Sequence, residues 1–139
     1  MTEISPSRQR ALVILLRVLG GLSLSAIGAV FIPHAWMNAI HRTIGLGDLP
    51  DLPVVEYLSR SLSLFYAWLA IVPIYASLDV PRHLGLIRLF ALSGLLVGVI
   101  QTIIDVTAPL PLWWTVAEGA FLFLYFGALW VLSRSSAGG

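Results

Sequence analysis

Cysteine is absent from this chain of 139 residues, and lysine is absent as well. Without thiols the chain can form neither disulfides nor thiolate metal sites, and Cys-x-x-Cys redox chemistry is excluded. All eight basic residues are arginines, the formal net charge is only +1, and the arginines form no basic run. We therefore expect no thiol chemistry and no nucleic-acid partner.

Charge is scarce throughout the sequence. Only 11% of the residues are charged and 58% are hydrophobic, with a mean hydropathy of +0.92, whereas a soluble domain carries about 25% charged residues. Four apolar segments are each long enough to cross a bilayer, which takes about 20 helical residues. They lie at about 11–32, 54–78, 84–106 and 112–132.

These segments predict an all-α fold, because hydrocarbon leaves a lone segment no other way to satisfy its backbone than a helix. We expect a four-helix transmembrane bundle with a short interfacial amphipathic helix after the first span. The predicted organisation is a cytoplasmic tail at 1–10, a four-span domain at 11–133 and a cytoplasmic tail at 134–139. Pro73 lies inside the second span, where we expect a kink.

Arginine placement predicts the orientation. Four arginines lie at the side that holds both termini and the loop 79–83, whereas Arg42 alone lies at the other side. The positive-inside rule then places both termini in the cytoplasm. We expect a multi-pass protein of the bacterial cytoplasmic (inner) membrane.

The segment 34–44 predicts the interfacial helix. Trp36, Met37, Ile40 and Ile44 recur at helical spacing, and polar side chains take the opposite face. Pro33 precedes the first turn, and Gly45 can end the helix in a left-handed conformation. A helix with this pattern is typical of a membrane surface.

Ionisable side chains inside the apolar segments are the candidate ligand- or ion-binding site. Charges in a bilayer are costly and usually pair with one another or with something bound. The predicted topology brings these side chains to one leaflet, as three carboxylates around one guanidinium. A protonated carboxyl, a cap by Arg42 or a protonated histidine, or a bound cation would compensate the excess charge. The candidates are Glu56, Arg60, Gln101, Asp105 and Glu118.

Two further patterns favour structural roles. Gly94, Gly98, Gln101 and Asp105 recur every three or four residues, which predicts a face where a neighbouring helix packs closely. Glu56 and Arg60 are four residues apart and predict a salt bridge that locks helices together.

On the cytoplasmic side we expect a structural clasp in which Asp79 pairs with an arginine. Its predicted members are Arg17, Asp79, Arg82 and Arg88.

His34 and His41 are the weakest candidates, as metal ligands. They are seven residues apart and share one face of the predicted surface helix, where an acidic side chain could complete a divalent metal site. No His-x-x-x-His or Glu-x-x-His spacing supports them, and a hydrogen-bonding role is the commoner one.

Several short runs resemble a family of uncharacterised small bacterial four-helix membrane proteins. They are Gly45-Leu-Gly-Asp-Leu-Pro50, Glu56-Tyr-Leu-Ser-Arg-Ser-Leu-Ser63, Tyr66-Ala67, Asp79-Val80 and Glu118-Gly119. A looser likeness, in size and topology only, is to DoxX-like proteins. Neither resemblance implies an activity or a site residue.

Three functional hypotheses follow. The first is a non-enzymatic accessory or assembly component of a membrane complex, without a cofactor. The second is a small proton- or cation-coupled transporter, with Glu118 or Asp105 as the coupling carboxylate. The third is an enzyme that acts on a lipid or quinone at the outer interface through His34 or His41. The expected partners are the lipid bilayer and a membrane protein or second copy of the chain.

Overall fold

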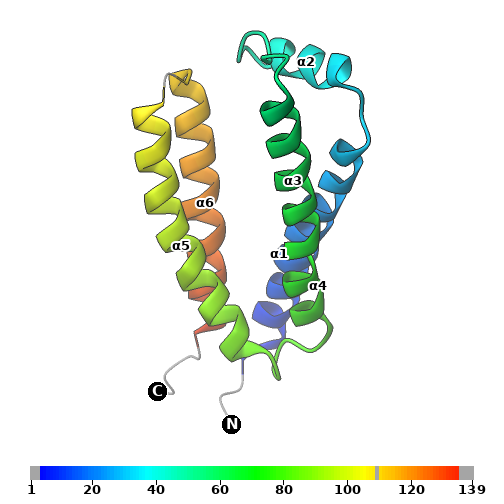
Figure 1. The fold of residues 1–139 in the computed structure, drawn as a ribbon. Coiled ribbons are helices and arrows are strands. Elements are labelled where there is room, and N and C mark those ends of the chain that lie inside the picture. Colours follow the sequence, from blue (N-terminus) through cyan, green and yellow to red (C-terminus); the bar gives the residue numbers. More distant parts are fainter. Residues whose placement is uncertain (1–3, 109, 135–139) are drawn as a thin grey trace. The chain divides into compact units, whose positions relative to one another are not determined.

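The computed structural model describes residues 4–108 and 110–134. Outside the described residues lie parts of the two predicted tails, at 1–3 and 135–139, and Pro109 between the third and fourth predicted spans. The described chain is helical, without a strand, which confirms the predicted all-α bundle (Figure 1). Its elements are α1 (Pro6–Ser25), the 3₁₀ helix η1 (Ala26–Val30), α2 (His34–Thr43), α3 (Pro53–Leu69), α4 (Ile71–Leu78), α5 (Leu84–Thr107) and α6 (Leu112–Ser133).

Four helical stretches are long and apolar enough to cross a membrane. They correspond to the four predicted segments and run over Pro6–Val30, Pro53–Leu78, Leu84–Thr107 and Leu112–Ser133. The chain is therefore a multi-pass membrane protein. The first stretch begins at Pro6 rather than at the predicted residue 11, because hydropathy marks where the side chains become apolar and not where the helix starts. Proline suits a first helical position, where its missing N–H has no partner to lose.

Pro73 interrupts the second span as predicted. The helix α3 ends at Leu69, four residues before Pro73, and α4 resumes at Ile71. A proline ring clashes with the carbonyl four residues earlier and donates no hydrogen bond to it. Ala70 between the helices keeps helical angles, with φ −56° and ψ −24°, so the break is local, and the kink itself stays a prediction.

The chain divides into two compact units. The first contains residues 4–18 and the described residues from 73 onward. Most of the buried side chains belong to it. They come from α1 (Leu12, Leu16), from α4 and the turn after it (Ala76, Val80), from α5 (Leu84, Ile87, Ala91) and from α6 (Tyr125, Phe126, Leu129).

The second unit, Leu19–Val72, is built on the contact between α3 and η1. Its buried hydrophobic residues are the small side chains Ala67 and Ala70. The large apolar side chains of α3, such as Leu62 and Trp68, are exposed. In a multi-pass protein such side chains suit contact with lipid.

The predicted surface segment is a helix with the predicted end. Gly45 follows α2 at φ +81°, a left-handed conformation that glycine adopts without strain. Gly45 N–H donates to Arg42 O and Leu46 N–H donates to His41 O, both over 3.0 Å. These two bonds form a Schellman motif, which satisfies carbonyls at the helix end and reverses the chain.

Candidate functional site

The predicted glycine stripe of α5 faces α6. A Cβ on Gly94 would overlap the ring of Phe126, and a Cβ on Gly98 would lie 3.3 Å from Leu122 Cβ. From the other helix, a Cβ on Gly119 would lie 3.4 Å from Thr102 Oγ1. The two helices therefore pack closely, as small residues allow in membranes, and any polar group on this face is enclosed between them.

Asp105 lies on that face and is the most enclosed charged residue described, with 3% of its surface exposed. Gln101 lies one turn earlier on α5, and its Nε2 donates to Asp105 Oδ1 over 3.0 Å. The other oxygen, Oδ2, is buried and has no hydrogen-bond partner within residues 4–108 and 110–134. Burying a carboxylate oxygen without a donor costs several kcal/mol. Asp105 Oδ2 therefore lacks a hydrogen-bond donor that its burial calls for.

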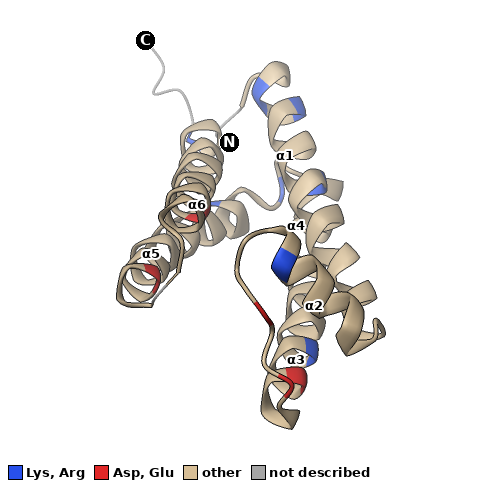
Figure 2. Cartoon of the chain, turned by 90° about the horizontal axis from the view of Figure 1, so that it is seen from above, with Lys and Arg blue, Asp and Glu red and all other residues tan. Residues whose placement is uncertain are grey.

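Glu118 supplies the second carboxyl, from α6. Trp114 lies one turn earlier, and its indole Nε1 donates to Glu118 Oε2 over 2.8 Å. The carboxyl of Glu118 lies near that of Asp105, close enough for the two groups to interact. Acidic positions of both helices are visible in Figure 2.

Helix geometry explains why these two side chains meet. Asp105 lies two residues before the end of α5, about 3 Å into the helix, and Glu118 lies six residues after the start of α6, about 9 Å in. Side chains lean toward the N-terminus of their own helix. Asp105 therefore leans away from the α5–α6 connection and Glu118 leans toward it, so their carboxyls converge.

Glu56 and Arg60 form the predicted ion pair in the second unit, with Arg60 Nη2 2.5 Å from Glu56 Oε1. The guanidinium also donates to the backbone, from Nη1 to Val30 O over 2.7 Å and from Nη2 to Ile32 O over 3.5 Å. The carbonyls at the end of a helix lack partners inside it. Arg60 thus joins α3 to the C-terminal end of η1, as the structural interpretation predicted.

The five candidate residues therefore form two groups, one in each unit. Gln101, Asp105 and Glu118 meet in the first unit, and Glu56 pairs with Arg60 in the second. Convergence of all of them around one guanidinium stays a prediction.

The residues of the predicted clasp make contacts other than the expected ion pair. No ion pair joins Asp79 to an arginine among the described residues. Asp79 Oδ1 instead accepts from the backbone N–H of Arg82 over 3.2 Å and closes the turn locally. Arg88 Nε and Nη2 both donate to Ser133 O, over 2.9 and 2.8 Å, and Arg17 Nε lies 3.5 Å from Ser77 Oγ. The sequence pattern could not predict these contacts to the backbone, because every residue has a backbone carbonyl and no residue type marks the one that an arginine will bind.

The two histidines lie on α2 as predicted. His41 Nδ1 is 2.9 Å from Gly47 O, and His34 Nδ1 is buried without a hydrogen-bond partner in the described part of the chain. No group of three or more His, Asp or Glu side chains that could hold a metal occurs among those residues. The metal role of His34 and His41 stays a prediction, without a third ligand to support it.

Trp114 belongs to the site, although it is not among the predicted site residues. It lies one turn before Glu118, a spacing at which helix side chains interact. The spacing of four residues could have indicated that Trp114 contacts Glu118, but a tryptophan near a span end is usually interpreted as an interfacial anchor.

No family model, curated protein or solved structure matches the chain. The resemblances to small bacterial membrane proteins and to DoxX-like proteins stay predictions.

Proposed function

We propose that this membrane protein takes up a proton at the Asp105–Glu118 pair, as a small proton-coupled carrier would. The observation that carries the proposal is the buried, unpartnered Oδ2 of Asp105 beside a second carboxyl from α6. One proton would give Oδ2 the hydrogen bond that it lacks. The same proton would reduce the charge enclosed between the two helices.

The neighbouring donors support a specific role for the pair. Gln101 holds one oxygen of Asp105 and Trp114 holds one oxygen of Glu118. Each carboxyl is thereby fixed in orientation by a neutral group on its own helix. Neutral donors do not cancel the negative charge of a carboxylate as an arginine would. The pair therefore keeps its affinity for a proton or a cation.

The composition of the site favours a proton over a divalent metal. Calcium takes six to eight oxygen ligands and magnesium needs near-octahedral geometry, whereas this site offers two carboxyls and no third acidic or histidine side chain among the described residues. A proton needs one donor and one acceptor oxygen. A monovalent cation is the alternative within the same hypothesis.

The accessory or assembly role remains the second candidate, and the arginines favour it. Arg60 and Arg88 both donate to carbonyls at helix ends, so two of the eight arginines have a structural use. If the Asp105–Glu118 pair takes up no ion, this role becomes the better account. An enzyme using His34 or His41 has no comparable support.

The proposed location is the bacterial cytoplasmic membrane, with both termini in the cytoplasm. Its support is the bias of arginine toward the side of the termini and the loop 79–83. This orientation would place the carboxyl pair near the outer face.

A titration of tryptophan fluorescence tests the proposal. Trp114 donates to Glu118, so loss of the shared proton should change the indole environment and the emission of the purified protein as pH rises. Glu118→Gln and Asp105→Asn should each remove this response. The matched control is Glu56→Gln, which alters a carboxyl of the second unit and should keep the response.

Sodium and potassium added at constant pH separate the two ligands. A proton site predicts that neither salt shifts the titration beyond what general screening explains. A shift by one of the two ions at equal ionic strength would identify a monovalent cation as the ligand instead. A parent protein whose emission ignores both pH and cations would refute the proposal.

A further inference from the structure

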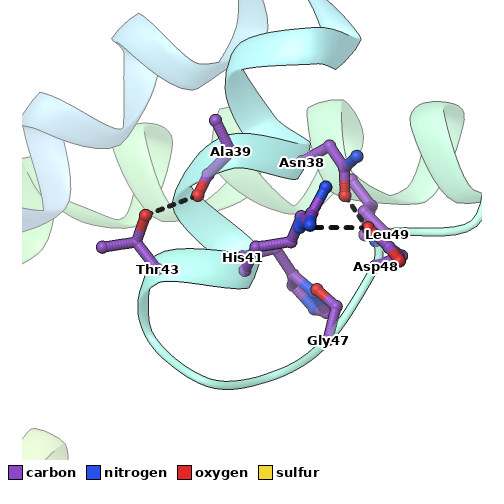
Figure 3. A network of polar contacts seen from close by, with 8 residues as sticks. Asn38, Ala39, His41, Thr43, Gly47, Asp48 and Leu49 are labelled. Carbon is purple, nitrogen blue, oxygen red and sulfur yellow. Dashed lines mark hydrogen bonds and ion pairs between the residues drawn. The ribbon is translucent and has the colours of Figure 1, made fainter.

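The polar face of α2 is closed by the loop that follows it (Figure 3). Asn38 Oδ1 accepts from Leu49 N–H over 2.7 Å, and His41 Nδ1 lies 2.9 Å from Gly47 O. Arg42 Nε lies 3.4 Å from Asp48 Oδ1. The polar groups of α2 and of the loop 44–49 thus pair with each other. The apolar face of α2 is left without a partner inside this unit.

That apolar face is exposed. Trp36, Ile40 and Ile44 recur every four residues along one side of the segment and are 66%, 55% and 38% exposed. A soluble protein would rarely leave such a stripe open to water. In a multi-pass protein the stripe has a suitable neighbour in the bilayer.

The chain holds α2 next to the membrane. Phe31, Ile32 and Pro33 alone separate the end of η1 at Val30 from the start of α2 at His34. Three extended residues reach at most about 10 Å, and η1 is the last part of the first membrane-spanning stretch. The helix therefore stays within reach of the interfacial region, where tryptophan is the preferred aromatic residue.

The charge on this segment is balanced. Surface helices that bind anionic lipids usually carry several lysines and arginines on their polar face, whereas α2 has Arg42 alone and Asp48 lies beside it. The pair is largely exposed and adds little stability, but it cancels the local charge. Attraction to anionic headgroups is therefore weak.

We infer that α2 and its loop form an in-plane anchor whose apolar face, Trp36, Ile40 and Ile44, enters the headgroup–acyl boundary of the bilayer without selecting anionic lipid. The occupant is lipid rather than a second protein, because the face is short and tied to a span end. Because Asp48 cancels the charge of Arg42, the anchor should bind neutral and anionic lipid equally well. This inference does not depend on the proposed proton site.

Site-directed spin labelling tests the anchor, and the absence of native cysteine means that one introduced cysteine takes all of the label. Ile40→Cys places the label on the apolar face. Ala35→Cys, an exposed position about 140° away around the helix, is the matched control. Oxygen concentrates in hydrocarbon and a nickel chelate stays in water, so the two relaxation agents report depth.

In phosphatidylcholine vesicles, the label at residue 40 should respond to oxygen and be shielded from nickel, and the label at residue 35 should show the reverse. Adding phosphatidylglycerol should change neither. The variant Asp48→Asn exposes the charge of Arg42, and it should draw the label at residue 40 deeper only when phosphatidylglycerol is present.

Three results would overturn the inference. Equal access of nickel to both labels would place the apolar face in water. Shielding of residue 40 from both agents would show that protein covers it. A deeper label in phosphatidylglycerol without the Asp48 change would show that the anchor does select charge. Quenching of Trp36 by brominated lipid, with Trp36→Phe as the blank, checks the result without a cysteine variant.

Discussion

Arg60 on α3 donates a hydrogen bond from Nη1 to the carbonyl of Val30, over 2.7 Å and across 30 positions of sequence. Val30 is the last residue of η1, where helical carbonyls have no partners of their own. The same guanidinium holds Glu56. One side chain thus joins two spans of the second unit and neutralises a carboxylate beside them.

Replacing Arg60 with leucine should lower the free energy of unfolding in detergent by about 2 kcal/mol. The substitution removes a charged hydrogen bond, which contributes about 1.5–3 kcal/mol, and leaves Glu56 without its partner. Arg60→Lys should lose less, because it keeps the charge but not the planar fork of donors. Denaturant or thermal unfolding measures the order: parent, then Lys, then Leu. Equal stability of all three would show that the Val30 contact is unimportant.

Gly94→Ala should destabilise the first unit by about 1–3 kcal/mol, the usual range for overpacking a core. A Cβ at this position overlaps the Phe126 ring, which also packs edge-on against Phe90 with centroids 5.4 Å apart. The matched control is Gly127→Ala, because a Cβ there meets nothing within 4 Å.

The double variant Gly94→Ala/Phe126→Leu provides a second check on that packing. Leucine should make room for the added methyl group, so Gly94→Ala should cost less in this background than alone. Purely additive losses in a double-mutant cycle would mean that the two positions do not interact.

Arg88→Gln should weaken the end of α6 and cost about 1–2 kcal/mol, because two charged donors to Ser133 O are lost. Arg88→Lys should recover part of the loss, since a cation near a helix C-terminus is favourable. Hydrogen exchange should show faster exchange at the last turns of α6. Arg82→Gln is the control, since Arg82 is exposed and its hydrogen bond to Asp79 uses the backbone N–H.

Glu118→Gln distinguishes the proton-site account from a purely structural role. A glutamine amide can donate to the carboxylate of Asp105 and still accept from Trp114, so it mimics the protonated glutamic acid. We expect the variant to be at least as stable as the parent near neutral pH. A structural ion cluster predicts the opposite, because the variant would lose a charge that the cluster needs. Thermal unfolding of both proteins in one detergent decides between the two outcomes.

The helices were predictable from the sequence, since span length, Pro73 and Gly45 each act through local chemistry. Long apolar runs require helix, Pro73 ended α3 four residues upstream, and Gly45 formed the predicted end of α2. The i,i+4 pair Glu56–Arg60 was predictable for the same reason.

The acceptors of the arginines were not predictable. Arg60 and Arg88 bind carbonyls of Val30 and Ser133, and a backbone carbonyl has the same chemistry at every residue. The expected ion pair of Asp79 with an arginine does not occur among the described residues, where the Asp79 carboxylate accepts from the backbone N–H of Arg82 instead. The clustering of Asp105 with Glu118 depended on helix packing, which the stripe of Gly94 and Gly98 did indicate.

Infrared difference spectroscopy of the carboxyl C=O stretch tests the shared proton most directly. A protonated carboxyl absorbs where a carboxylate does not, and the signal shifts in deuterium oxide. We predict a band in the parent near neutral pH that disappears as pH rises, is missing in the double variant Asp105→Asn/Glu118→Gln, and persists in Glu56→Gln. A parent spectrum without such a band, or a band that survives the double variant, would contradict the account.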